Sequence, residues 1–109
     1  MIEQNETVEL LEGAGFDVIS AKQRIPVYIT VNDTEEFESR LYIDYFARKA
    51  GEYYIVKVAK ERRPVELKGA AMRDAWLSYS LLYPEASGVL YVDMQTRKIK
   101  KISFSVESE

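Results

Sequence analysis

The apolar and polar positions of residues 41–60 alternate as they do in a pair of β-strands. The segment LYIDYFARKAGEYYIVKVAK holds two runs rich in Tyr, Ile, Val and Phe, with Gly51 in the polar stretch between them. Aromatic and β-branched side chains pack well on a pleated surface, and glycine supplies the positive φ that a tight turn needs. We therefore predict adjacent antiparallel strands at 41–47 and 53–60, in a hairpin centred on Gly51.

Further strands are predicted on both sides of this hairpin. Residues 16–20 read as a short strand, and residues 24–31 (RIPVYITV) as a clearer one with alternate apolar positions. The polar residues between these two segments are expected to turn the chain into a hairpin. The acidic segment 32–40 is expected to be a loop or one helical turn, anchored to the body by Phe37. Two more strands are predicted at 87–94 and 99–106, with Val106 facing inward.

A period near 3.6 residues predicts two helices. The first covers residues 3–13, with Val8 and Leu11 on its apolar stripe. The second begins at Pro64, which suits a first helical turn, and ends near Tyr83, before Pro84. Gly69 and the alanines after it suggest a close approach to the sheet. The core positions of this helix are Met72, Ala75, Trp76, Tyr79, Leu82 and Tyr83.

The order helix, strands, helix, strands predicts a single α/β domain over residues 1–109. We expect a central mixed sheet, mostly antiparallel, flanked by two main helices (an α+β-like arrangement). A chain of 109 residues is long enough for one hydrophobic core and too short for two ordinary domains.

Asp44 and Lys60 are two charged residues that the predicted hairpin brings close together. The alternation places Leu41, Ile43 and Tyr45 on one face of the first strand and Asp44 on the other, between Tyr42 and Phe46. A carboxylate there is costly unless a cation or hydrogen-bond donor pairs with it. Lys60 lies diagonally opposite on the neighbouring strand. We therefore expect Lys60 or backbone donors to hold the carboxylate.

This order of elements resembles the PD-(D/E)XK nuclease superfamily, which has the restriction-endonuclease-like fold. The features shared are a helix carrying glutamates, a Gly15-Phe16 strand entry, Asp44 in a strand, a hairpin, and a strand ending in Lys60. The resemblance implies Asp44, Lys60 and Glu6 (or Glu3) at catalytic positions, with Asp44 as a ligand of Mg²⁺ or Mn²⁺. The family's acidic-x-Lys triplet reads Val58-Ala59-Lys60 here, so one expected carboxylate is missing.

The charge is unevenly divided along the chain. Residues 1–47 hold ten acidic and three basic side chains, whereas residues 48–109 hold eight acidic and twelve basic ones. A cluster of basic side chains indicates a surface that binds phosphates, so we expect weak, sequence-independent contact with DNA or RNA. The candidate residues for that contact are Lys57, Arg62, Arg63, Lys68 and Arg73.

Three functions stay open from the sequence. The chain is a nuclease-like domain that binds nucleic acid without hydrolysis, a metal-dependent nuclease with a relocated carboxylate (Glu6, Glu61, Glu66 or Asp74), or a small α/β protein-interaction module.

The absence of histidine and cysteine excludes thiolate chemistry, histidine general bases and the usual zinc ligands. No apolar run is long enough to span a membrane, which predicts a cytoplasmic protein. The oligomeric state stays open.

Overall fold

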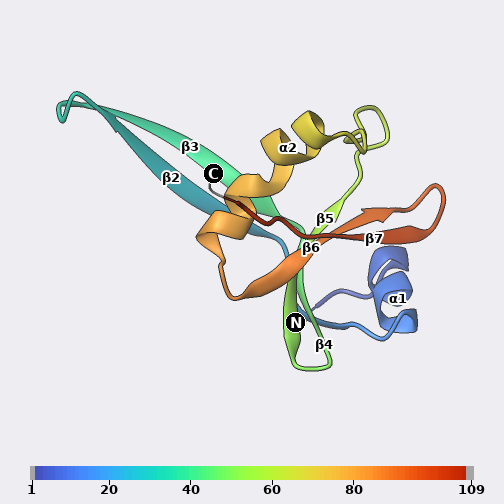
Figure 1. Cartoon of the computed structure of the whole chain (residues 1–109). Helices are drawn as coiled ribbons and strands as arrows, with labels where there is room; N and C mark the ends of the chain where they lie inside the picture. The colour runs from blue at the N-terminus through green and yellow to red at the C-terminus, as the bar shows by residue number, and fades with distance from the viewer. Residues whose placement is uncertain (1, 108–109) are drawn as a thin grey trace.

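The computed structural model describes residues 2–107, and it shows a five-stranded sheet covered by one helix on each face (Figure 1). A separate two-stranded ribbon projects from this body. The elements in chain order are α1 (Glu6–Gly13), β1 (Asp17–Ser20), β2 (Gln23–Val31), β3 (Glu35–Ile43), β4 (Tyr45–Lys49), β5 (Glu52–Val58), α2 (Gly69–Leu82), β6 (Ala86–Asp93) and β7 (Lys98–Ile102).

The strands of the main sheet follow the order β1-β4-β5-β6-β7. All neighbouring pairs are antiparallel except β5 and β6, which run parallel and are joined by the crossover through α2. A parallel pair needs a long connection of this kind because the chain must return to the same end of the sheet. The predicted fold class, a mostly antiparallel mixed sheet with two main helices, is therefore confirmed.

Two apolar clusters fill the space between the layers. Leu11 of α1 packs against one face of the sheet, and Trp76 and Tyr79 of α2 pack against the other. The central strands β5 and β6 contribute alternate residues to both clusters, as their period of two requires. The fully or almost fully buried contributors are Ile55, Val56, Val89, Leu90 and Val92.

The hairpin β4–β5 forms as predicted, but its centre is shifted and β5 ends at Val58, so Lys60 lies beyond the strand and not on it as predicted. Tyr45 pairs with Val56 and Lys49 with Glu52, so the turn is centred between Ala50 and Gly51. Both turn residues have positive φ, at 52° and 79°. This conformation matches the right-handed twist of the flanking strands.

Residues 41–47 do not form one strand, contrary to the prediction. β3 ends at Ile43 and β4 begins at Tyr45, with Asp44 at the bend between two different sheets. Ile43 packs in the α2 cluster, whereas Tyr45 packs in the α1 cluster. The predicted common face of Leu41, Ile43 and Tyr45 is therefore wrong, because the bend changes which alternate residues face each helix.

The acidic segment 32–40 is also not a loop. Most of it belongs to β3, which pairs with β2 over nine residues. Asn32 and Asp33 turn the chain with φ values of 53° and 59°, a conformation that these two residue types tolerate. β1 pairs with β4 rather than with β2, so the predicted 16–31 hairpin is wrong. Phe37 is 52% exposed and does not anchor the segment.

Both helices begin later than predicted. The Asn5 side chain caps α1 by accepting a hydrogen bond of 2.9 Å from the Val8 N–H, so Glu3 lies outside the helix. α2 begins at Gly69 rather than at Pro64. A Cβ at Gly69 would meet nothing within 4 Å, so the predicted close approach to the sheet is wrong there.

Two predicted core positions are also exposed. Leu82, at the end of α2, is 50% exposed, and Val106, beyond the end of β7, is 84% exposed. No helix within residues 2–107 is long and apolar enough to cross a membrane.

Candidate anion-binding cavity

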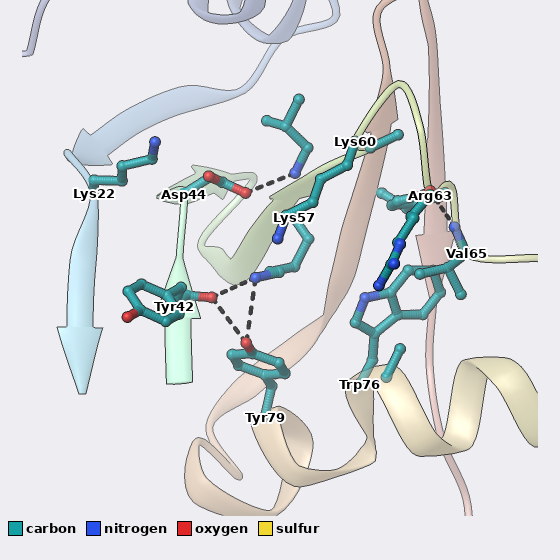
Figure 2. A pocket seen from close by; sticks show the side chains of 13 residues that line it. Lys22, Tyr42, Asp44, Lys57, Lys60, Arg63, Val65, Trp76 and Tyr79 are labelled. Atoms are coloured by element: carbon teal, nitrogen blue, oxygen red, sulfur yellow. Dashed lines mark hydrogen bonds between the residues drawn. The ribbon is translucent and has the colours of Figure 1, made fainter. Parts of the chain in front are cut away.

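A cavity of about 730 Å³ opens between the end of β5, the bend at Asp44 and the side of α2 (Figure 2). Its floor is aromatic and its rim is basic. The lining residues are Lys22, Tyr42, Asp44, Lys57, Val58, Ala59, Lys60, Arg63, Val65, Ala75, Trp76, Tyr79 and Tyr91. The structure thus brings the predicted pair Asp44 and Lys60 to one cavity.

Asp44 is held by backbone groups of β5. Its Oδ2 accepts a hydrogen bond of 2.8 Å from the Val58 N–H, and its own N–H donates to the Val56 carbonyl at 3.1 Å. The prediction that backbone donors or Lys60 hold this carboxylate is confirmed through the backbone donor. Within residues 2–107, no ion pair joins Asp44 to Lys60, and Lys60 is exposed.

The Lys57 side chain is held by two oxygen atoms. Its Nζ donates to the Tyr42 carbonyl and, at 3.2 Å, to the Tyr79 hydroxyl. That hydroxyl donates in turn to the Tyr42 carbonyl at 2.8 Å. The end of β3 is therefore tied to α2 through the Lys57 ammonium and the Tyr79 hydroxyl.

Positive charge dominates the cavity. Among the residues that the structure describes, four basic side chains line it, Lys22, Lys57, Lys60 and Arg63, against the single carboxylate of Asp44. Figure 2 shows Lys60 extending toward Lys57 and the Arg63 guanidinium beside Trp76, with Lys22 beyond Asp44. The Tyr91 hydroxyl accepts a hydrogen bond of 2.7 Å from the Val65 N–H, which holds the loop that carries Arg63. Low-dielectric walls concentrate the field of such clustered charges.

The other predicted phosphate ligands lie outside the cavity. Arg62 is exposed on the same loop and does not line it. Lys68 pairs with Glu66 at 3.1 Å, and Arg73 pairs with Asp74 at 3.0 Å. Lys22 was not predicted as a site residue, because it lies at the point where the chain passes from β1 of the main sheet to β2 of the ribbon.

Glu6 lines a second cavity, of about 410 Å³, together with Glu61 and Asp93. Residues 58–60 separate the two cavities and line both of them. Glu6 is therefore not brought to Asp44, and Glu66 and Asp74 are engaged with their basic neighbours. Within residues 2–107, no three acidic side chains form a group that could hold a metal ion. Magnesium needs several fixed oxygen ligands, so the first cavity does not fit this ion.

Comparison with known proteins gives little further information. No protein-family profile and no curated protein sequence matches the chain. A solved structure described as SSO0001 is similar at 12% identity with a TM-score of 0.49, over 88% of this chain and 45% of that one. The chain thus spans less than half the length of that protein, and a similarity this distant supports no inference about function.

Proposed function

We propose that this chain is a nuclease-like domain that binds the phosphates of DNA or RNA in the cavity beside Asp44 and does not hydrolyse them. The observation that carries the proposal is the convergence of four basic side chains on one cavity that holds one carboxylate. Phosphodiesters are the abundant polymeric anions that such a rim attracts, independently of base sequence. The resemblance to the PD-(D/E)XK superfamily supports the choice of nucleic acid over other anions.

The lack of hydrolysis follows from the ligands present. Phosphodiester cleavage by bound metal ions requires carboxylates that fix the ion and orient the attacking water. Position 58, the acidic position of the family's motif, is Val58, and the candidate relocated acids lie elsewhere. Asp44 remains alone, with one of its oxygens already accepting a hydrogen bond from the Val58 N–H.

Binding of labelled oligonucleotides, followed by fluorescence anisotropy over a range of salt concentrations, tests the proposal. Four phosphate contacts predict a slope of log affinity against log salt of about −3.6 for duplex DNA. Arg63→Glu should weaken binding strongly, because it reverses a charge on the cavity rim. Arg62→Glu is the matched control: it makes the same charge change at the adjacent residue, and the Arg62 side chain does not line the cavity.

Equal loss in the two variants would show that net charge, rather than the cavity, determines binding. No binding at low salt would refute the proposal and favour a protein-interaction module. Cleavage with added Mg²⁺ or Mn²⁺ that disappears in Asp44→Ala would establish the nuclease alternative.

A further inference from the structure

One face of the β2–β3 ribbon carries exposed aromatic rings beside basic side chains. Directly opposite residues of two antiparallel strands share a face, and every second residue of each strand returns to it. The pairs on this face, here called the polar face, are Arg24 with Tyr42, Pro26 with Arg40, and Tyr28 with Glu38. Tyr28 and Tyr42 are 63% and 51% exposed, and no aromatic pair within residues 2–107 includes either ring.

The inner end of the polar face adjoins the cavity beside Asp44. Tyr42 is one of the residues that line this cavity, and Lys22, which lines it too, directly precedes β2 (Figure 2). The Tyr42 carbonyl accepts the hydrogen bonds from Lys57 and Tyr79 that tie β3 to α2. A polyanion held in the cavity therefore meets the polar face where it leaves the cavity.

Charges of opposite sign are separated along the polar face. Its inner half is basic, with Arg24 and Arg40, whereas its outer half is acidic, with Glu36 and Glu38. Arg40 lies 3.8 Å from Glu38, and both side chains are about half exposed. An exposed ion pair of this kind is weak, so a phosphate can take its place at Arg40. Because the carboxylates repel phosphates, the path of a polyanion along the ribbon ends near Tyr28.

The spacing of the two rings suits unpaired bases. Tyr28 lies four residues along β2 from the partner of Tyr42, which is about 13 Å at the usual rise of roughly 3.3 Å per residue. Basic side chains that contact the backbone, together with aromatic rings on which bases stack, are typical of surfaces that bind single strands. A duplex fits less well, because its bases stack on one another and phosphates bordering its grooves would repel the acidic end of the ribbon.

We propose that the polar face of the ribbon binds a single strand of DNA or RNA. Unpaired bases stack on Tyr42 and Tyr28, while phosphates contact Arg24, Arg40 and the basic rim of the cavity. This inference rests on the proposed function, because the cavity supplies most of the phosphate contacts. It narrows the ligand to unpaired nucleic acid and gives a role to the ribbon, which projects from the main sheet (Figure 1).

Fluorescence anisotropy with a labelled oligothymidylate of about 12 nucleotides, and with a duplex of the same length, tests the stacking. The wild type should bind the single strand about tenfold more tightly than the duplex. Tyr28→Ala should weaken single-strand binding about 5- to 150-fold, the usual effect of removing one stacking ring, and leave duplex binding unchanged. Tyr28→Phe keeps the ring and should bind like the wild type. Phe37→Ala is the matched control, because it removes a ring that is 52% exposed on the opposite face.

The salt dependence of binding tests the two arginines. Arg24→Gln with Arg40→Gln should reduce the slope of log affinity against log salt by about 1.4 for the single strand, since each phosphate contact contributes about 0.7. Far-UV circular dichroism establishes that each variant is folded. An unchanged slope would show that neither arginine contacts the strand and would overturn the proposed path.

The variants also separate this inference from the proposed function. Single-strand binding that is lost in Arg63→Glu but kept in Tyr28→Ala would overturn the role of the ribbon and leave phosphate binding in the cavity standing. Equal losses in Tyr28→Ala and Phe37→Ala, or a duplex bound as tightly as the single strand, would likewise overturn stacking on the polar face. No binding of either oligonucleotide at low salt would refute the proposed function, and this inference with it.

Discussion

Removal of the Asp44 side chain should affect stability and ligand binding in opposite directions. Asp44→Ala deletes the acceptor of the Val58 N–H, a hydrogen bond of 2.8 Å at a partly buried position. An unsatisfied donor of this kind costs about 1–3 kcal/mol. Because the cavity is open to water, we expect the lower half of that range, about 1.5 kcal/mol.

Thermal unfolding measures this cost. For a domain of this length, about 1 kcal/mol lowers the Tm by roughly 4–8 °C, so Asp44→Ala should unfold roughly 6–12 °C below the wild type. Asp44→Asn keeps a carbonyl oxygen as the acceptor, so it should lose less than half as much. Equal Tm values for wild type and Asp44→Ala would show that the hydrogen bond contributes nothing to stability.

Oligonucleotide affinity supplies the second readout. Within residues 2–107, Asp44 is the only acidic side chain that lines the cavity, and its repulsion of a phosphate a few ångströms away is on the order of 1 kcal/mol in water. Asp44→Asn should therefore tighten binding about fivefold. Weakened binding in this variant would refute the reasoning, because it would mean that the carboxylate helps to hold the ligand.

Two further changes test the site and the core. Val58→Glu places a second carboxylate beside Asp44 at the position where the resembled family has one, and calorimetry should then detect Mn²⁺ binding that Val58→Gln lacks. Gly88→Ala should destabilise the chain by about 1–3 kcal/mol in chemical denaturation, because its Cβ would lie 2.8 Å from the Ile102 carbonyl oxygen. Gly69→Ala, which meets no atom within 4 Å, should be neutral or stabilising by up to about 1 kcal/mol. Gly88→Ala as stable as Gly69→Ala would contradict the close packing of β6 against β7, and Mn²⁺ binding by Val58→Gln would contradict the role given to the carboxylate.

The sequence was sufficient where local pattern and tertiary structure agree. The tight turn at Gly51, the apolar β6 segment and the Trp76–Tyr79 face of α2 all form as predicted. The hydrogen bond from a backbone N–H to the Asp44 carboxylate was also among the predicted possibilities. Each of the first three features also carries its own local signal, a turn glycine, a continuous apolar run or a helical period.

The sequence was insufficient where a distant partner decides the conformation. Residues 35–40 are polar and have no strand signal of their own, but β2 pairs with them across the Asn32–Asp33 turn. No glycine or proline marks the bend at Asp44, so the run of apolar residues hides the change of sheet. Lys22 lies where the chain passes from β1 of the main sheet to β2 of the ribbon, a second change of sheet that no residue marks, and this explains why it could not be predicted.

The parallel pairing of β5 and β6 has a consequence for synthesis of the chain on the ribosome. Synthesis of β5 is complete at residue 58, but synthesis of β6, which pairs with it, is complete only at residue 93. At usual elongation rates, roughly 5–20 residues per second, the nascent chain carries an open edge of aromatic and β-branched residues for roughly 2–7 s. During this interval the β4–β5 hairpin lacks its core partners Val89, Leu90 and Val92, because β6 is synthesised after it. Chaperones that bind extended apolar segments have access to β5 during that period, before the sheet closes.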